Sequence, residues 1–347
     1  MLDLSRLSPA QRQAVLAPDG PLLIAAGPGS GKTLVLAARI AYLVTARQVS
    51  PASILAITFA TKAARELRER LAGMLGAPGE AVDVATFHAF GFRIIRQWSE
   101  ELGLGPGPLV VYSETESLGV LEQAMDEHEI DREGRPLSEL AAELERYRLG
   151  NTSAGASDRL SRLADAYEAV LSRRAAVDFP AMLAFPRRLF AACPNTLRLY
   201  QDSYRFILCD EVQDICAVQY APLRQLAERH RNLVVVGDPR QCLYGWRGAD
   251  IRFLREFQCD FPEASWISLD QNFRSTGRIV ELANALGAAL PENRPLWTDN
   301  PLGEPALLVV CGDEQAEAAF VAAEIERLLT TRRIDHPGEV RGCSTAP

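Results

Sequence analysis

Short runs of apolar residues recur along the chain, and each is four to six residues long, which is typical of strands buried on both faces of a sheet. Helical patterns fill several of the intervals, for example Thr33–Val44 and Lys62–Leu75. Alternation of strands and helices predicts an α/β fold with a mainly parallel sheet. The apolar runs lie at Leu22–Ala26, Ile54–Phe59, Phe206–Cys209, Leu233–Val236, Ser265–Leu269 and Leu307–Val310.

One long interval carries few strand signals. From about Arg93 to Tyr204 the pattern is helical, punctuated by two predicted loops at 103–108 and 150–157. A Pro-rich connection follows later, at Pro291–Pro305. We therefore expect a helical subdomain inserted into the first α/β domain. Its clearest helix has apolar residues at helical spacing, namely Leu160, Leu163, Ala164, Tyr167 and Leu171.

Composition narrows the class of protein. The 347 residues suggest about two domains, and 48% apolar residues are ordinary for a globular protein. Seven scattered cysteines without a CxxC pair, and four distant histidines, argue against a disulfide framework or a zinc site. No apolar run approaches the ~18 residues that a membrane helix needs, and no secretory pattern opens the chain, so we expect a cytoplasmic protein.

The formal net charge of the chain is −8 at pH 7. This overall negative charge argues against nucleic-acid binding. Any such binding must come from a local groove. The basic residues are almost all arginine, and Lys32 and Lys62 are the two lysines in the chain. A coding bias explains this composition, but it also directs attention to the two positions that kept lysine.

A glycine-rich segment follows the first predicted strand and opens a helix, which is the context that a phosphate-binding loop requires. Its glycines let backbone N–H groups curl around an anion at the helix N-terminus. Lys32 would contact the β- and γ-phosphates, and the Thr33 hydroxyl would bind Mg²⁺. The alternative is an ordinary glycine-rich turn. The segment comprises Ala26, Gly27, Pro28, Gly29, Ser30, Gly31, Lys32 and Thr33.

A second apolar strand, Phe206–Cys209, ends in two carboxylates. Asp210 can hold Mg²⁺, and Glu211 can orient or deprotonate an attacking water. An acidic pair at a strand end is often only a solvated loop start, but together with a phosphate loop it indicates nucleotide hydrolysis. The 178 positions between Lys32 and Asp210 require an inserted subdomain, in agreement with the helical interval.

A third apolar run, Leu233–Val236, leads into a polar loop that contains several glycines and ends at Gly248. Gln241 could sense the γ-phosphate. Tyr244 and Trp246, beside Arg247, could stack on unpaired bases, although aromatic rings buried under the loop are the alternative.

Arg274 follows the strand Ser265–Leu269, far in sequence from the phosphate loop. An arginine brought across a domain cleft onto a phosphate acts as an arginine finger, whereas the alternative is a surface salt bridge.

These segments, in this order from about Leu7 to Leu329, resemble the motifs of superfamily 1 DNA helicases of the UvrD/Rep type. The resemblance implies that Gln11 recognises adenine and that Arg274 touches the γ-phosphate from the second RecA-like domain. The segments Thr58–Ala63 and Thr86–Phe90 resemble elements that contact single-stranded DNA. On that basis the DNA-binding residues are Phe59, Lys62, His88, Tyr244, Trp246 and Arg247.

The same resemblance implies an ATP-dependent 3′→5′ helicase that uses ATP and Mg²⁺, acts on single-stranded DNA and has no membrane segment. The expected architecture is a RecA-like P-loop NTPase domain with a parallel sheet, a helical inserted subdomain and the incomplete start of a second RecA-like domain. The expected bounds are 1–92 with 205–264 for the first domain, 93–204 for the insertion and 265–347 for the second domain.

The chain departs from the family pattern in several places. Leu34 stands where the family usually has arginine, with Arg39 remaining as a possible nucleotide contact, and Pro239-Arg240 replaces an acidic pair. Motifs V and VI and the 2B subdomain are absent, so we expect a shortened helicase that binds ATP, hydrolyses it weakly and does not unwind alone. The alternatives are a nucleotide- and single-stranded-DNA-binding fragment without turnover, one that docks on a protein partner through its incomplete second domain, a non-functional truncated gene product, or an unrelated phosphate-loop enzyme such as a kinase.

Overall fold

The structure is a computed structural model that describes residues 3–104, 108–150, 158–245, 248–289 and 294–330. Two compact units divide the chain, at residues 1–301 and 302–347. The first unit contains the sheet and the candidate site. Among the described residues, no helix has both the length and the apolar character needed to cross a bilayer.

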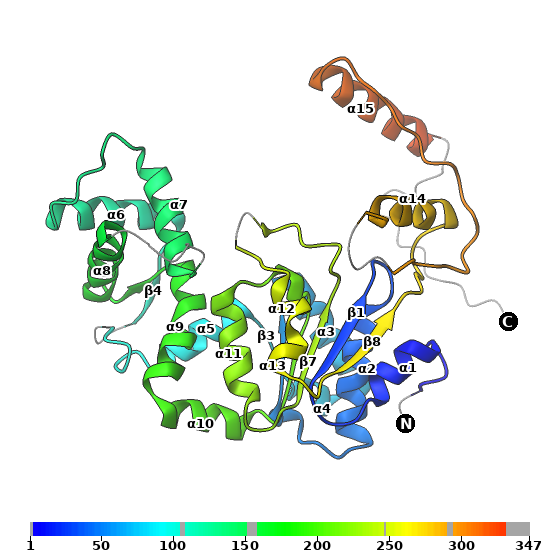
Figure 1. The fold of residues 1–347 in the computed structure, drawn as a ribbon, viewed down its shortest axis with the longest axis horizontal. Coiled ribbons are helices and arrows are strands. Elements are labelled where there is room, and N and C mark those ends of the chain that lie inside the picture. Colours follow the sequence, from blue (N-terminus) through cyan, green and yellow to red (C-terminus); the bar gives the residue numbers. More distant parts are fainter. Residues whose placement is uncertain (1–2, 105–107, 151–157, 246–247, 290–293, 331–347) are drawn as a thin grey trace. The chain divides into compact units, whose positions relative to one another are not determined.

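A six-stranded, wholly parallel sheet forms the centre of the first unit, with strand order β3-β2-β6-β7-β1-β8 (Figure 1). This confirms the predicted α/β fold. Five of the six strands coincide with predicted apolar runs, and β3 was missed. The strands are β1 (Leu22–Ala26), β2 (Ile54–Thr58), β3 (Asp83–Thr86), β6 (Phe206–Cys209), β7 (Leu233–Gly237) and β8 (Ser265–Leu269).

Successive strand residues point to opposite faces of the sheet, so each face has its own core. In β1, Leu22 and Ile24 join the core under α1, α2 and α3, whereas Leu23 joins the core under α5, α9, α10, α11 and α13. The helices on the first face are α1 (Pro9–Leu16), α2 (Lys32–Thr45) and α3 (Thr61–Leu75). Those on the second are α5 (Phe87–Gln97), α9 (Phe179–Ala192), α10 (Pro194–Ser203), α11 (Ala217–Ala227) and α13 (Phe257–Asp260).

The inserted helices form a core of their own, around the predicted stripe on α8. Leu163, Ala164, Tyr167 and Leu171 are all buried there. The predicted loops at 103–108 and 150–157 fall largely on residues 105–107 and 151–157, which lie outside the described part of the chain. The insertion contains α6 (Glu114–Glu127), α7 (Leu137–Arg148), α8 (Asp158–Arg173) and a parallel strand pair, β4 (Val110–Val111) with β5 (Ala176–Val177).

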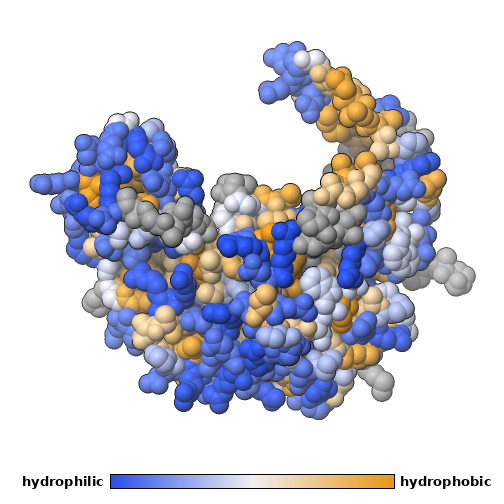
Figure 2. Space-filling view, viewed as in Figure 1, coloured by the Kyte–Doolittle hydropathy of each residue, from blue (hydrophilic) through white to orange (hydrophobic). Residues whose placement is uncertain are grey.

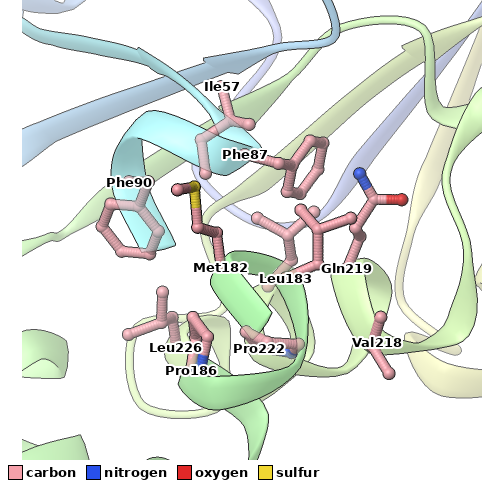
Figure 3. Close-up of a pocket in the computed structure, with 11 residues that line it drawn as sticks. Ile57, Phe87, Phe90, Met182, Leu183, Pro186, Val218, Gln219, Pro222 and Leu226 are labelled. Atoms are coloured by element: carbon pink, nitrogen blue, oxygen red, sulfur yellow. The ribbon is translucent and has the colours of Figure 1, made fainter. Parts of the chain in front are cut away.

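The last two helices of the expected insertion, α9 and α10, also cover the main sheet. Leu189, Phe190 and Tyr200 share a core with strands β2 and β6. Figure 3 shows the seam where apolar side chains of α5, α9 and α11 face one another. Gly91 permits the close approach of α5 to α9, because a Cβ there would stand 1.7 Å from the Met182 carbonyl oxygen.

The strand expected to open the second domain instead completes the first sheet. Residues 265–269 pair in parallel with β1, and Ile267 and Leu269 are buried in the core beneath α1 and α2. The first two residues of this strand, Ser265 and Trp266, are exposed. The sequence pattern did not indicate that the strand lies at the edge of the first sheet. The helix α14 (Gly277–Gly287) follows within the same unit.

The second unit contains one described element, α15 (Glu314–Thr330), which buries no residue. Figure 2 shows apolar side chains along it, among them the exposed Phe320, Val321 and Ile325. The predicted strand Leu307–Val310 is wrong, because the segment is exposed and pairs with no strand in the part of the chain that the structure describes. Short elements elsewhere are η1 (Pro51–Ser53), α4 (Ala77–Glu80), η2 (Val212–Asp214) and α12 (Arg252–Arg255).

Candidate nucleotide and nucleic-acid site

The carboxyl ends of all six parallel strands meet at one edge of the sheet, where α/β proteins bind ligands. Almost every residue selected from the sequence lies just beyond one of these strand ends. Following the strand order from β3 to β8, the residues are His88, Phe59, Asp210, Gln241, Lys32 and Arg274.

The predicted phosphate loop joins β1 to α2. Two of its residues, Gly29 (φ 68°) and Gly31 (φ 84°), have left-handed backbone conformations that favour glycine. The loop is braced from within, because the Ser30 hydroxyl donates to the Gly27 carbonyl at 2.7 Å. Helix α2 begins at Lys32, so its first N–H groups have no intrahelical acceptor and can bind an anion.

Lys32 and two carboxylates form the charged centre of the site. The Lys32 ammonium is 3.9 Å from a Glu211 carboxylate oxygen and 3.4 Å from the Ala26 carbonyl. Burial, together with the neighbouring Glu211 charge, raises the pKa of Asp210 to about 7. Glu211 itself has φ of 53°, an uncommon conformation for a side-chain-bearing residue, of the kind found at functional sites.

Asp214 adds a third carboxylate to this cluster. Gln213 Nε2 donates to Glu211 at 2.9 Å and to Asp214 at 3.2 Å, whereas the other oxygen of Asp214 is buried and has no hydrogen-bond partner among the described residues. Burial, with the Glu211 charge, raises the pKa of Asp214 to about 6. Such an excess of buried negative charge fits a site that binds a cation.

Magnesium fits these residues. Among the described residues no group of three or more His, Cys, Asp or Glu side chains could hold a metal by itself. Mg²⁺ usually takes one or two protein oxygens, with water and substrate phosphates completing its shell. The Thr33 hydroxyl, in the first turn of α2, and Asp210, directly after β6, are of the required kind.

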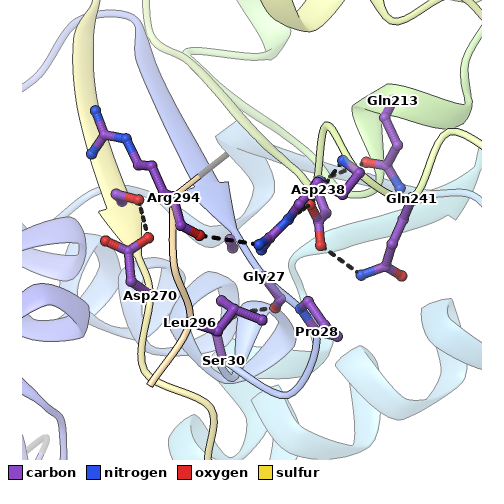
Figure 4. Close-up of polar contacts among 12 residues, drawn as sticks. Gly27, Pro28, Ser30, Gln213, Asp238, Gln241, Asp270, Arg294 and Leu296 are labelled. Carbon is purple, nitrogen blue, oxygen red and sulfur yellow. Dashed lines mark hydrogen bonds and ion pairs between the residues drawn. The ribbon is translucent and has the colours of Figure 1, made fainter. Parts of the chain in front are cut away.

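Asp238, which follows β7, is a site residue that the sequence analysis missed. It is fully buried, and its two carboxylate oxygens hold different side chains (Figure 4). One accepts from Gln241 Nε2 at 2.7 Å, and the other accepts from Arg240 Nε at 3.3 Å. Its N–H donates to Gln213 Oε1 at 3.0 Å. An acid directly after a buried strand, as at Asp210, was the available signal.

The segment after β8 lies directly on the phosphate loop. Asn272 Nδ2 donates to the Pro28 carbonyl at 2.8 Å, and the Phe273 N–H donates to the Gly29 carbonyl at 2.9 Å. A Cβ built on Gly29 would stand 2.9 Å from the Cβ of Arg274. Arg274 therefore approaches the loop from the same sheet rather than from the neighbouring domain that was expected, and its side chain is exposed.

Gln11 braces the loop from α1. Its Nε2 donates to the Ser30 carbonyl at 2.8 Å, and its Oε1 accepts from the Ser8 N–H at 3.0 Å. Only glycine fits at position 31, because a Cβ would stand 2.8 Å from Gln11 Nε2. Gln11 is thus close enough to the loop to act on a bound nucleotide, and its adenine contact stays a prediction.

Arg39 and Leu34, which were expected to contact the nucleotide, have different neighbours in the structure. Arg39 is buried, and its guanidinium donates to four carbonyls at the end of α1, those of Ala14, Val15, Ala17 and Pro18. Burial lowers its pKa to about 10. Leu34 packs against the hydrophobic core beneath α1 and α2. Arg39 therefore joins two helices instead of contacting the phosphate loop.

Aromatic residues gather at the β2–β3 side of the edge. The Phe59 and Tyr244 rings stack with centroids 5.4 Å apart and planes 23° apart. The His88 ring meets the edge of Phe179 at 5.8 Å, and Phe179 is 53% exposed. Lys62 is exposed on α3, 3.9 Å from Glu66. Trp246 and Arg247 lie outside the described residues.

The sequence analysis did not identify Phe179 as a site residue. Its neighbour Asp178 is held in place by a buried ion pair with Arg148. Asp178 caps α9 by accepting from the Ala181 N–H at 2.9 Å. Arg148 donates to both of its carboxylate oxygens, at 2.5 and 3.0 Å, and the Tyr167 hydroxyl donates at 2.8 Å. Burial raises the pKa of Asp178, but the Arg148 charge and the hydrogen bonds from Arg148, Ala181 and Tyr167 together outweigh burial and hold the pKa below its usual range.

Comparison with known proteins agrees with this site. The family model described as the UvrD/REP helicase N-terminal domain matches residues 7–262. An ATP-dependent DNA helicase PcrA of Staphylococcus aureus (strain Mu50) is 38% identical over 335 residues, covering 93% of this chain and 46% of the relative. That of Bacillus subtilis (strain 168) is 38% identical over 339 residues, covering 94% and 46%. The chain spans about half the length of the curated relatives it matches.

Proposed function

The chain belongs to the UvrD/REP helicase family, and on that premise we propose that it binds Mg-ATP and couples ATP hydrolysis to movement along single-stranded DNA in the 3′→5′ direction. One observation carries the proposal. The loop after β7 contributes to both halves of the site, since Gln241 is held at the nucleotide side by Asp238 and Tyr244 stacks on Phe59 at the other side.

The charged centre accounts for hydrolysis. Lys32 and the N-terminus of α2 bind the phosphates, and Glu211 orients the attacking water and accepts its proton. Thr33 and Asp210 would hold Mg²⁺, which would supply charge neutralisation at the phosphates. Gln213 keeps Glu211 in place through its 2.9 Å hydrogen bond. Arg274 and Gln241 lie where they can sense the terminal phosphate.

The aromatic residues account for DNA binding by a protein of net charge −8. Base stacking on a protein ring contributes about 1–3 kcal/mol per base without requiring positive charge. Phe59, His88, Tyr244 and the exposed Phe179 offer ring surface beside the carboxyl ends of β2 and β3. We assign Lys62 to a phosphate of the DNA backbone.

We limit the proposal to the part of the activity for which the residues are present. We propose nucleotide binding and weak DNA-stimulated hydrolysis from the residues described above, whereas the relatives named as DNA helicases are about twice as long. We infer that a motor of this kind works in the cytoplasm. A fragment that binds nucleotide without turnover is distinguished by measuring phosphate release.

The test compares the two lysines of the chain. A fluorescent ATP analogue is titrated with and without Mg²⁺ against the wild type, Lys32→Ala and Lys62→Ala, and phosphate release is measured with and without oligo-dT. Lys32→Ala should lose Mg-dependent nucleotide binding, and Lys62→Ala should keep it while binding DNA more weakly. Equal nucleotide binding by the wild type and Lys32→Ala would refute the phosphate-loop assignment.

A further inference from the structure

Arg240 is a basic residue at the phosphate loop that the proposed function has not used. It stands where the family resemblance leads one to expect an acid, two positions after Asp238 and directly before Gln241. Its side chain is only 14% exposed. We propose that Arg240 binds the terminal phosphate of ATP beside Gln241 and thereby discriminates ATP from ADP. This inference rests on the proposed function.

The guanidinium is held in contact with the loop. Its Nη2 lies 2.8 Å from the position that a Cβ on Gly27 would occupy, so the guanidinium end is close to the loop backbone. Hydrogen bonds in the described part of the chain use Nε and Nη1, and none of them uses Nη2. The group that faces the loop therefore has donor capacity available for a ligand.

Asp238 orients Arg240 and Gln241 together. The N–H and Nε of Arg240 donate to one of its oxygens at 3.0 and 3.3 Å, and Gln241 Nε2 donates to the other at 2.7 Å. Because Asp238 is fully buried, this arrangement is closely defined. The two side chains are thus fixed as a pair, one cationic and one neutral, next to the loop.

A cavity lies beside the Arg240 guanidinium, and one of the hydrogen bonds of Arg240 could be exchanged for a bond to an anion. A cavity of about 400 Å³ opens beside the guanidinium and is lined by Gly27, Asp238, Arg240, Asp270 and Arg294, among others, whereas Lys32 and Gln241 are not among its described lining residues. Asp238 is paired with Arg240, and Asp270 accepts a hydrogen bond from Ser268 but keeps its negative charge. Arg240 Nη1 donates to the Arg294 main-chain carbonyl at 3.1 Å (Figure 4). A phosphoryl oxygen is a better acceptor for a guanidinium than a neutral carbonyl.

The experiment measures affinity for two nucleotides. A non-hydrolysable ATP analogue and ADP, both with Mg²⁺, are titrated against the wild type, Arg240→Ala, Arg240→Lys and Arg252→Ala. Arg252 is the control, because it lies a few residues further along the chain, is exposed and forms an ion pair with the nearby Asp250. Removing a charged hydrogen bond should weaken ATP-analogue binding about 10- to 100-fold in Arg240→Ala, with ADP binding changed by less than about 3-fold.

Arg240→Lys keeps the charge but loses the planar fork, so we expect an intermediate ratio of ATP to ADP affinity. This variant also carries the test if Arg240→Ala does not fold. Equal losses for ATP and ADP, or no change in either, would assign Arg240 to a structural tether and overturn the inference. If the wild type shows Lys32-dependent binding without an Arg240 effect, only this inference fails, whereas absence of any Mg-nucleotide binding would defeat the proposed function as well.

Discussion

Replacing Asp210 with asparagine should make the nucleotide-free protein more stable while abolishing its function. Asp210 is buried beside Glu211, and these two conditions raise its pKa from 3.8 to about 7. A raised pKa means that the ionised carboxylate is unfavourable in the folded state. Asparagine removes that charge but keeps an oxygen that can accept from the Glu211 N–H, a bond of 3.0 Å in the wild type.

The sign and size of the effect follow from proton linkage. Between the unfolded pKa and the folded pKa, the folded state binds more protons than the unfolded state, so the free energy of unfolding falls as the pH rises. The full shift corresponds to about 4 kcal/mol, of which about 3 kcal/mol falls between pH 5 and pH 8. Above about pH 7.5 the dependence should level off, because Asp210 is then ionised in both states.

The assay is urea unfolding of wild type and Asp210→Asn at several pH values between 5 and 8, without Mg²⁺ or nucleotide. The expected result is that the advantage of Asp210→Asn grows by about 3 kcal/mol across this range. Asp165→Asn is the matched control, because it makes the same chemical change on the exposed side of α8. Comparison of the two variants separates the effect of the buried position from that of the chemical change itself.

Nucleotide titration of the same variant completes the test. Asp210→Asn should lose Mg-dependent ATP binding by ~100-fold or more, since a neutral amide is a poor ligand for Mg²⁺. The reasoning would be refuted by a stability difference that does not change with pH, or by a variant that is destabilised at pH 8. Either result would mean that Asp210 is not under electrostatic strain in the folded protein.

Three further predictions concern the DNA side and the two buried arginines. Tyr244→Ala should weaken oligo-dT binding about 5- to 100-fold with a small change in salt dependence, measured by fluorescence anisotropy at two salt concentrations, and unchanged affinity would exclude base stacking there. Arg39→Met should lower the unfolding free energy by about 3–5 kcal/mol in urea, because four carbonyls of the chain lose their donor, and a loss of nucleotide affinity without destabilisation would contradict this. Arg148→Met leaves the Asp178 carboxylate buried and unpaired, so DNA affinity should fall with nucleotide affinity retained if the pair positions Phe179, whereas an equal fall in both would indicate general damage.

The sequence by itself determined the elements whose signals are local. We predicted five of the six strands in the sheet, the phosphate loop between β1 and α2, and the apolar stripe of α8. Each of these features depends on residues that are close together in the sequence. The acidic pair at 210–211 was also found, since a buried strand that ends in carboxylates is visible within six residues.

The tertiary structure decided where these elements and their side chains went. The strand at 265–269 could have opened a second sheet, but its pairing with β1 is set by residues more than 200 positions away. The apolar run Leu307–Val310 has strand composition, yet a strand forms only beside a partner. Arg39 and Asp238 show the same limit, because whether a charged side chain meets a ligand or a backbone carbonyl depends on which distant segments surround it.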